Sequence, residues 1–578
     1  MHTFTVWAPN AGAVEVVLDG AGVRLPMRPA ADRPGTWTAV VEQAGPGTRY
    51  GFSLDCGPVR PDPRSAAQPD GVDGCSEVVD HTAFAWTDQH WRGLALPGTV
   101  LYELHVGTFT PAGTFDGAIE RLPYLVELGI DAVELLPVAA FPGRRGWGYD
   151  GVDLFAPHAA YGGPEGLKRF VDAAHAAGIG VIMDVVYNHL GPAGNYLGEY
   201  GPYFSDRHHT NWGDAVNLDG PGSVEVRRFF VDNALLWLRD YHCDGLRLDA
   251  VHALIDDSAT HLLEELVAEV TALGAHVRRP LFLIAESDLN DPKFVRPRGN
   301  GGYGLDAAWA DEWHHALHAT LTGETDGYYR DFGPVELLAK ALRQAWVYDG
   351  CWSAHRERIH GRPPTGLTGH QFVVSTQNHD QVGNRAIGQR LPELTSPGRL
   401  RIAAALLLTG PFTPMLFAGE EWGASAPFLY FTDHPDAELG AAVSAGRRTE
   451  FAAFGWNPEE VPDPQDPATF QRSRLDWTEP ARAPHRGLLD WYRNLIALRR
   501  RIPALTDPRL DAVSVEAAAD VLKVRRGPVL VTVNLGRATA RVDVPDGSVA
   551  LATSDPGIRL AGAVVELPAD TVAILLAT

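Results

Sequence analysis

The sequence predicts an α/β fold: a (β/α)8 barrel of the TIM type with a smaller β-sandwich at each end of the chain. Between residues 96 and 500, short apolar strands alternate with amphipathic helices, and eight such units are the number that closes a barrel. Residues 1–95 and 501–578 instead contain strands separated by turns. A chain of 578 residues also exceeds the ~250–300 residues at which one hydrophobic core stops growing. We therefore expect three domains with these boundaries.

Eight short, mostly apolar segments are the predicted barrel strands. A helix over 115–128 should end at Gly129, the next helix should stop at Gly178, and Ser223 should cap the helix before the fourth strand. An open, doubly wound sheet is the alternative, but it needs a glycine-rich phosphate turn after an early strand, which the sequence lacks. The predicted strands are 100–106, 131–136, 179–184, 245–249, 281–286, 305–309, 372–376 and 413–417.

The two terminal regions show strand patterns punctuated by Pro and Gly. The segment 57–74 is rich in Pro, Asp and Gly and is predicted to be a loop. Within the barrel region, long inserts at 138–165 and 187–222 follow two strands, and such loops are where a barrel builds its pocket. The predicted terminal strands are 4–8, 14–18, 36–40 and 49–54, and then 513–517, 521–525, 529–534, 541–544, 564–567 and 571–576.

Composition excludes several classes of function. A net charge of −23 argues against a nucleic-acid partner, whose phosphates demand a basic face. No run of 18 apolar residues is present, which argues against a membrane span. The segment 1–7 lacks the basic and apolar regions of a secretory signal, and four scattered cysteines are too few for a disulfide framework or a zinc site. These features favour a reduced, cytoplasmic setting.

Polar side chains stand where four of the predicted strands end. Asp184 ends the third strand, Asp249 ends the fourth, Glu286 ends the fifth, and Asp380 follows the seventh. In a barrel these ends meet at one mouth, although they are nearly two hundred residues apart in the chain. We therefore expect an active site there. Histidines follow three of these strand ends, at His189, His252 and His379.

Two chemistries use such a set of side chains. The first is a metal-dependent hydrolase, because carboxylates and histidines could together bind an ion. A barrel of that type usually offers two closely spaced histidines on its first strand, whereas this strand has only His105. The second is glycoside hydrolysis, which needs two carboxyl groups flanking the bond to be cut. The sequence favours the second chemistry and predicts neither a metal nor a cofactor.

Two of the carboxyl groups fit different roles in glycoside hydrolysis. Because side chains alternate along a strand, Arg247 and Asp249 should project to the same side, where the guanidinium favours an ionised carboxylate. Glu286 follows an apolar run, so desolvation should raise its pKa and keep it protonated as a proton donor. Asp380 is a third carboxylate that could hold sugar hydroxyls. A retaining mechanism further predicts a separation of about 5–5.5 Å between the carboxyl groups of Asp249 and Glu286.

Four segments resemble the signature regions of the α-amylase superfamily, glycoside hydrolase family 13. They are 184–189, 245–252, 285–287 and 378–380, and their order and spacing also match. The resemblance implies that Asp249 is the nucleophile, Glu286 the acid/base and Asp380 a stabiliser of the transition state. Ser287 departs from the pattern, since Asn or Asp is expected beside the acid. The resemblance assigns the sugar subsite at the cleaved bond to Tyr149, His189, Arg247 and His379.

Five further segments narrow the resemblance to members of the superfamily that release trehalose from malto-oligosyltrehalose. These segments are 102–109, 146–151, 311–315, 379–384 and 417–423, and the likeness extends to both terminal domains, the first of which resembles a carbohydrate-binding module with an immunoglobulin-like sandwich. We expect the remaining substrate contacts from His252, Asp311, Trp313, His314, His315, Gln381 and Asn384.

The resemblance implies a specific reaction and specific partners. The expected enzyme is a retaining glycosidase that cuts the α-1,4 bond next to a terminal trehalose, leaving a maltooligosaccharide. It would act as a monomer on the product of malto-oligosyltrehalose synthase. A glucan branching enzyme is the alternative, since it uses the same barrel and the same covalent intermediate. A non-catalytic glucan-binding protein is disfavoured, because the three catalytic carboxylates are all present.

Overall fold

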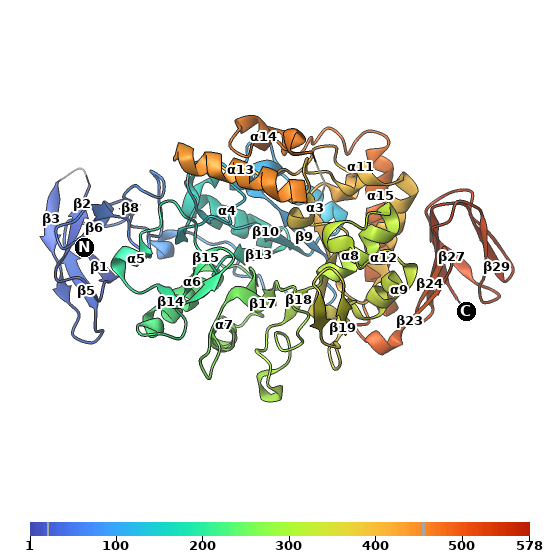
Figure 1. Ribbon diagram of the computed structural model, residues 1–578, viewed down its shortest axis with the longest axis horizontal. Coiled ribbons are helices and arrows are strands. Elements are labelled where there is room, and N and C mark those ends of the chain that lie inside the picture. The colour runs from blue at the N-terminus through green and yellow to red at the C-terminus, as the bar shows by residue number, and fades with distance from the viewer. Residues whose placement is uncertain (20–21, 454–456, 578) are drawn as a thin grey trace.

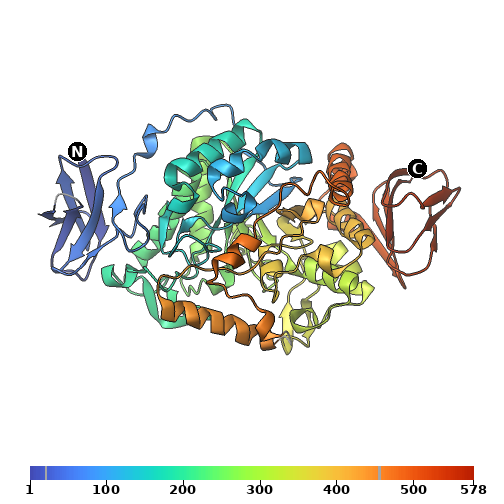
Figure 2. The same ribbon diagram turned by 90° about the horizontal axis from the view of Figure 1, so that it is seen from above.

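The computed structural model describes residues 1–19, 22–453 and 457–577. The molecule is elongated, with antiparallel sheets at both ends and a barrel between them (Figure 1). The N-terminal sheets and the C-terminal sheets therefore lie on opposite sides of the barrel, as the view from above also shows (Figure 2). This arrangement agrees with the fold class predicted from the sequence.

A closed barrel of eight parallel strands forms the centre of the molecule. Each strand is bonded in parallel to its neighbours, and the last strand pairs with the first, so the sheet has no edge. All eight predicted strands are confirmed, with small differences in length. They are β9 (Leu101–Leu104), β10 (Ala132–Leu135), β13 (Gly180–Val185), β16 (Gly245–Leu248), β17 (Phe282–Ala285), β18 (Ala307–Trp309), β21 (Phe372–Ser375) and β22 (Thr413–Phe417).

Helices surround the barrel, and those that carry one apolar face pack it inward. On α6, for example, Val226, Phe230, Ala234 and Trp237 all face the interior. The principal helices are α2 (Phe115–Ile119), α3 (Leu122–Leu128), α4 (Gly163–Ala176), α6 (Ser223–Arg239), α7 (Leu262–Val277), α8 (Asp311–Thr322), α9 (Val335–Gln344), α12 (Pro397–Thr409), α13 (Ala437–Ala453) and α15 (His485–Arg501).

Two helix predictions need correction. The segment predicted as one helix over 115–128 is two helices, α2 and α3, because a proline in the first turn of α3 starts a new helix after Arg121. Ser223 is the first residue of α6 and not its cap; Gly222 stands before it with a φ of 83°. The predicted end at Gly129 is confirmed, since this residue adopts a left-handed conformation with a φ of 97°.

The N-terminal region contains two antiparallel sheets. One has the order β1-β5-β4 and the other β3-β2-β6-β7, with β8 paired to β6. The four predicted strands are present, but β3, β4, β7 and β8 were not predicted, because they are short and interrupted by charged residues or proline. The bounds are β1 (His2–Trp7), β2 (Val14–Leu18), β3 (Val23–Pro26), β4 (Arg28–Pro29), β5 (Thr36–Val41), β6 (Arg49–Leu54), β7 (Val59–Arg60) and β8 (Ser76–Glu77).

The C-terminal region forms a five-stranded sheet, β23-β24-β25-β30-β27, and a three-stranded sheet, β26-β29-β28. Arg399 of α12 joins this region to the barrel, because its Nε donates to Asp570 Oδ1 at 2.9 Å. Strands β27 and β28 were not predicted. The bounds are β23 (Val513–Ala518), β24 (Val521–Arg526), β25 (Val529–Asn534), β26 (Ala540–Asp543), β27 (Val549–Thr553), β28 (Arg559–Ala561), β29 (Val564–Leu567) and β30 (Thr571–Leu576).

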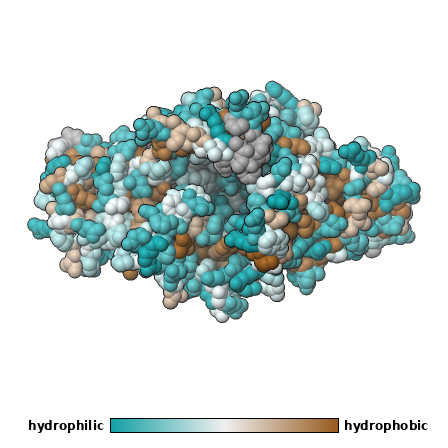
Figure 3. Space-filling model, viewed as in Figure 1, coloured by the Kyte–Doolittle hydropathy of each residue, from teal (hydrophilic) through white to brown (hydrophobic). Residues whose placement is uncertain are grey.

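The two long inserts lie at the end of the barrel where the strands finish. The first contains β11 (Ala139–Ala140) and β12 (Asp153–Pro157), and the second contains α5 (Leu197–Tyr200) and a hairpin of β14 (Phe204–Thr210) and β15 (Gly213–Val216). The face of the molecule drawn in Figure 3 is hollowed near its centre and mostly hydrophilic at its rim. Among the described helices, none combines the length and the apolar character that crossing a membrane requires.

Candidate active site

Arg247 is the centre of a charged cluster at the end of strand β16. Its buried guanidinium donates from Nη1 to both oxygens of Asp184 at 2.9 Å and to Asp249 Oδ1 at 2.8 Å. Nη2 lies 3.8 Å from Glu286 Oε2, and the Trp309 ring lies beneath the guanidinium at 4.2 Å. The prediction that Arg247 and Asp249 share one side of the strand is confirmed. One arginine thus holds three carboxyl groups from three neighbouring strands.

Asp249 is held from two directions while keeping part of its carboxylate open. Arg247 binds Oδ1, and the Asn188 amide donates to Oδ2 at 2.7 Å and to the Asp249 carbonyl at 2.9 Å. The side chain retains 13% exposure. Because donors on both sides fix its orientation, the carboxylate is preorganised to meet an electrophilic carbon from the mouth.

The surroundings of Glu286 favour its protonated form. Burial raises its pKa well above the usual range, and the negative charges of Asp249 and Asp311 add to this effect against the opposing influence of Arg247. The direction agrees with the prediction made from the apolar strand before it. The side chain is 17% exposed, so its carboxyl group still reaches the mouth. A carboxyl group that favours its protonated form, beside an ordered carboxylate, is the arrangement that a proton donor and a nucleophile require.

Ala250 fixes the position of Glu286 relative to the end of β16. It adopts a left-handed conformation, with a φ of 39°, which is costly for a residue with a Cβ. In this conformation its N–H donates to Glu286 Oε2 at 2.5 Å, and the Val251 N–H donates to the Glu286 carbonyl at 3.0 Å. The main chain that follows Asp249 therefore holds the neighbouring acid.

Tyr149, His379 and Glu103 form a chain of hydrogen bonds beside Arg247. The Tyr149 hydroxyl donates to Asp184 Oδ2 at 2.7 Å, so its oxygen can accept from His379 Nε2 at 2.9 Å. The other ring nitrogen, Nδ1, lies 2.5 Å from Glu103 Oε1. Burial would lower the pKa of His379, but the Glu103 carboxylate overcomes this and raises it. The raised pKa favours the form of His379 in which both ring nitrogens carry protons, and that form adds positive charge to the site.

Asp380 and its neighbours lie nearer to solvent than the other carboxylates. Asp380 is exposed, and its Oδ1 accepts from Asn384 Nδ2 at 2.6 Å. Gln381 Nε2 contacts Asp311 Oδ1 at 3.4 Å. Burial raises the pKa of Asp311 to about 7, and Asp380 contributes to this shift. The structure thus brings Asp380, Gln381, Asn384 and Asp311 together on the side of strands β18 and β21.

The predicted substrate contacts at 311–315 lie on helix α8, and only some of them face the mouth of the barrel. Asp311 and His315 are half-buried, but Trp313 is 0% exposed and belongs to the hydrophobic core. His314 is 2% exposed, and its ring nitrogens contact the Thr376 carbonyl at 2.6 Å and the Tyr329 hydroxyl at 2.8 Å. The structure therefore does not bring Trp313 and His314 to the mouth.

His189 and His252 stand on different loops of the mouth. His189 Nε2 contacts the Tyr149 carbonyl at 3.1 Å, so this histidine lies next to the Asp184–Tyr149 pair. His252 Nε2 lies 4.0 Å from Asp288 Oδ1, and Arg356 Nη1 lies 2.8 Å from the other oxygen of the same carboxylate. Both histidines are partly exposed, as side chains that bind a ligand must be.

Two residues that support the cluster, Glu103 and Trp309, were not predicted from the sequence. Glu103 lies on β9, and its Oε2 also accepts from the His379 N–H at 2.9 Å. Trp309, on β18, supports the Arg247 guanidinium. A signal for Glu103 was available: an acidic residue within an otherwise apolar, fully buried strand needs a partner.

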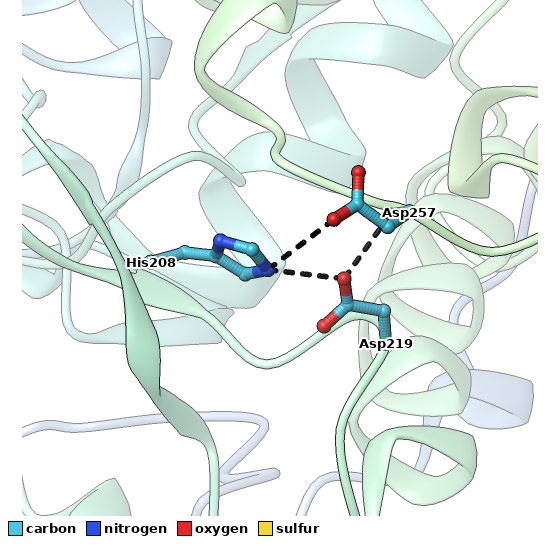
Figure 4. A group of neighbouring side chains, drawn as sticks. All are labelled: His208, Asp219 and Asp257. Carbon is cyan, nitrogen blue, oxygen red and sulfur yellow. Dashed lines mark hydrogen bonds and ion pairs between the residues drawn. The ribbon is translucent and has the colours of Figure 1, made fainter.

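A group of three side chains away from this cluster could hold a metal ion. Ligand atoms of His208, Asp219 and Asp257 lie within 4.8 Å of one another, and Figure 4 shows the His208 ring facing both carboxylates. His208 Nε2 lies 3.1 Å from Asp219 Oδ2 and 4.0 Å from Asp257 Oδ2. Arg207 Nη2 already lies 3.1 Å from Asp219 Oδ1. This group shares no residue with the cluster around Arg247.

Comparisons with known proteins match both the barrel and the N-terminal sheets. Residues 73–212 match the family described as alpha amylase, catalytic domain, and residues 1–58 match carbohydrate-binding module 48, the isoamylase N-terminal domain. A solved protein from Salmonella typhimurium whose description names an alpha amylase is 39% identical, with a TM-score of 0.90 over 99% of this chain and 97% of that one.

Two curated relatives match almost the whole length of the chain. The malto-oligosyltrehalose trehalohydrolase of Arthrobacter ramosus is 54% identical over 97% of both chains. That of Rhizobium sp. (strain M-11) is 51% identical over 99% of this chain and 97% of its own. At this level of identity over the full length, the chain belongs to the malto-oligosyltrehalose trehalohydrolase family, built on an alpha-amylase catalytic domain.

Proposed function

We propose that this chain is a retaining glycoside hydrolase that cleaves the α-1,4 bond next to the terminal trehalose of malto-oligosyltrehalose. The observation that carries the proposal is the pairing of an ordered carboxylate, Asp249, with a buried acid, Glu286, on one guanidinium. The relatives that match over the full length carry this substrate in their names. The products are free trehalose and a maltooligosaccharide.

The reaction proceeds in two displacements. Asp249 attacks the anomeric carbon of the glucose at the cleaved bond, while Glu286 gives its proton to the oxygen that leaves with trehalose. The bond between carbon and that oxygen breaks as the bond to Asp249 Oδ forms. Glu286, now ionised, takes a proton from water, and the resulting hydroxide displaces Asp249 and completes the hydrolysis.

The residues around Arg247 bind the glucose whose bond is broken. Tyr149, His189 and His379 offer a hydroxyl and ring nitrogens beside the nucleophile. Asp380 approaches from the solvent side and accepts hydrogen bonds from sugar hydroxyls as the ring distorts and positive charge develops.

The trehalose unit binds on the side of Glu286, since this acid protonates the oxygen that trehalose retains. Asp311, His315 and Gln381 lie on the elements after β18 and β21, and His252 lies after β16. Trehalose joins two glucoses through both anomeric carbons, so it bends differently from maltose. Hydrogen bonds to its hydroxyls discriminate because a wrong ligand leaves buried polar groups unpaired.

Maltotriosyltrehalose should be cleaved to maltotriose and trehalose with a kcat/KM at least ~100-fold higher than that for maltopentaose, because several site-built hydrogen bonds are lost with the wrong disaccharide. Product analysis by chromatography measures the ratio, and NMR of the first maltotriose released should show the α-anomer. Equal kcat/KM values for maltotriosyltrehalose and maltopentaose would contradict specificity for trehalose. New α-1,6 linkages in amylose would indicate a branching enzyme, and a β-anomer would exclude retention.

Two variants locate the source of this selectivity. His315→Ala and Gln381→Ala should each reduce the ratio of the two kcat/KM values more than they reduce the slow cleavage of plain maltodextrin. His276→Ala, an exposed histidine on α7, is the matched control and should leave the ratio unchanged. If the two site variants behaved like this control, the trehalose side of the site would lie elsewhere.

Chelation should leave the rate of trehalose release within about twofold of its starting value, because carboxylates committed to sugar chemistry leave no open metal position at the mouth. Trehalose release is measured after dialysis against a chelator and after return of Ca²⁺ or Zn²⁺. Rate loss that His208→Ala reproduces would place a structural ion at the group in Figure 4. Rate loss that His208→Ala does not reproduce would contradict a metal-free reaction.

We place domain boundaries near residues 95 and 500, supported by the gap between β8 and β9 and by the end of α15 at Arg501. The four cysteines are free, which fits a reduced cytoplasmic setting. A monomer supplied with substrate by a malto-oligosyltrehalose synthase is the simplest functional unit.

A further inference from the structure

We propose that a pH-sensitive latch holds the linker between the N-terminal sheets and the barrel against the floor of the barrel, the end at which its strands begin. In the closed latch, His175 in its charged form joins Asp88 of the linker to Asp244, which directly precedes β16. The latch opens as the pH rises. It lies at the end of the barrel opposite the mouth, and its operation does not depend on the proposed function.

The linker, residues 78–99, has a short 3-10 helix at His81–Ala83 and consists of turns and extended chain elsewhere. In Figure 2 it is the blue coil that leaves the N-terminal sheets and passes along one side of the barrel. Its last part belongs to the floor of the barrel, because Leu96 is 4% exposed and lies in one apolar cluster with Ile182 and Met415 of the strands. The position of the linker therefore affects how well the floor is covered.

His175 lies in the last turn of α4, with both of its ring nitrogens against carboxylates. Nδ1 lies 2.9 Å from Asp88 Oδ2, and Nε2 lies 3.1 Å from Asp244 Oδ2. The side chains of His175 and Asp244 are fully buried, and that of Asp88 is 6% exposed. A neutral imidazole donates from one nitrogen and would turn a lone pair toward one of the carboxylates, whereas an imidazolium donates to both. The geometry thus favours the charged form of His175.

The pKa shifts of the two partners agree with this form. Burial would lower the pKa of His175, but the Asp244 and Asp88 carboxylates overcome this and raise it. Burial would raise the pKa of Asp88, but hydrogen bonds from His175 and His242 overcome this and lower it. A proton on His175 and an ionised Asp88 therefore stabilise each other.

Neighbouring elements bind the linker on both sides of Asp88. His242, in the turn after α6, places its Nδ1 2.8 Å from Asp88 Oδ2. Asp172 of α4 accepts from the Thr87 N–H and from the Thr87 hydroxyl, each at 2.7 Å. The other charged or titratable groups packed around the latch are Cys243, beside Asp244, and Arg279, which faces Cys243 from the chain before β17.

Two tryptophans of the linker cover the two histidines. The Trp91 ring stacks on His175, with centroids 4.6 Å apart and planes 11° apart, and Trp86 stacks on His242 at 3.8 Å and 15°. Trp91 Nε1 also donates to Asp244 Oδ1 at 2.7 Å. Because the face of an indole attracts a cation, each stack favours a protonated imidazole. Loss of the proton from His175 therefore weakens an ion pair and a stack that both hold the linker.

The two pKa shifts set the direction in which the latch depends on pH. A histidine whose pKa is raised in the folded protein contributes its full stabilisation below its ordinary pKa of about 6.5, and this is lost as the pH rises through the folded-state pKa. An aspartate whose pKa is lowered contributes above its ordinary pKa of about 4, and this is lost as the pH falls through the folded-state pKa. The latch is thus strongest between about pH 4 and 6.5.

Hydrogen exchange of peptides that cover residues 84–96, followed by mass spectrometry, measures the opening of the linker. After correction for the intrinsic effect of pH on exchange, wild-type protection should fall between about threefold and tenfold per pH unit above about pH 6.5, because up to one proton leaves on opening. His175→Gln and Asp88→Asn should each lower the protection at pH 6 and reduce its dependence on pH to less than about twofold per unit. His90→Gln, an exposed histidine of the same linker, is the matched control and should behave as wild type.

Thermal unfolding distinguishes a latch from a contact that is merely structural. The difference in Tm between wild type and His175→Gln should be largest near pH 6 and should shrink by about half or more at pH 9, because only the charged histidine contributes it. A Tm difference that stays constant with pH would overturn the latch. Wild-type linker protection that does not vary with pH after the correction would overturn it as well, and this measurement decides the question even if His175→Gln fails to fold.

Discussion

Replacement of Asp249 by alanine should lower kcat for trehalose release by about 10³-fold or more while the protein stays folded. The variant loses the atom that forms the covalent bond, and no neighbouring carboxylate can substitute, because Asp184 is bound by Arg247 and Tyr149. The fold should persist, since Arg247 keeps Asp184 as a partner. Single-turnover release of trehalose from maltotriosyltrehalose measures the loss.

Two controls make the Asp249 result specific. Asp249→Asn keeps the shape of the side chain and removes its charge, so it should be as inactive as the alanine variant. Asp511→Ala removes an exposed carboxylate before the C-terminal sheets and should retain the wild-type rate. A folded Asp249→Ala protein with a rate within about tenfold of wild type would contradict the assignment of Asp249 as nucleophile. Loss of covalent catalysis lowers the rate by far more than that.

Replacement of Glu286 by glutamine should also cost about 10³-fold or more on malto-oligosyltrehalose, and it should change the pH dependence. Glu286 donates a proton, so it is active only below its pKa, and the raised pKa extends activity toward neutral and higher pH. As pH rises through that pKa, wild-type kcat/KM should fall. Glutamine does not titrate, so the residual activity of the variant should lack this alkaline fall.

A substrate with a good leaving group tests the same assignment independently. A 4-nitrophenyl maltooligoside needs little protonation as it leaves, so Glu286→Gln should release nitrophenol in a burst close to the wild-type rate and then stall at the covalent intermediate. Azide should restore turnover, since this anion attacks without a general base. If the activated substrate were as slow as the natural one, Glu286 would not be the proton donor.

The central part of the site could be predicted because it depends on strand geometry alone. Alternation along β16 places Arg247 and Asp249 together, and the parallel strands place Asp184 and Glu286 beside them. The residues that helix α8 contributes to the site could not be predicted in the same way. Consecutive residues of α8 point in directions about 100° apart, so 311–315 cannot all face the mouth, and Trp313 and His314 turn toward the interior.

Long-range packing explains the other differences from the sequence-based view. Trp212, in the turn between β14 and β15, stacks on the His189 ring, although more than twenty residues separate the two in the chain. Nothing in the local sequence pattern indicates that this hairpin folds back over His189. Glu103 is matched with His379 across a barrel closure that joins the first strand to the last. Local propensity predicts which segments form strands, but it does not specify which side chains meet when the barrel closes.

The sharing of Arg247 among Asp184, Asp249 and Glu286 has a consequence for the electrostatic potential of the mouth. Even with Glu286 left out because its pKa is raised, the four carboxyl groups of Asp184, Asp249, Glu103 and Asp380 outnumber the two basic side chains, Arg247 and His379. The potential in the mouth is therefore negative, and it favours positive charge at the anomeric carbon as the bond breaks. The same potential repels phosphorylated sugars. Nitrogen-containing sugar mimics that carry a proton should therefore inhibit this enzyme at lower concentrations than sugar phosphates of similar size.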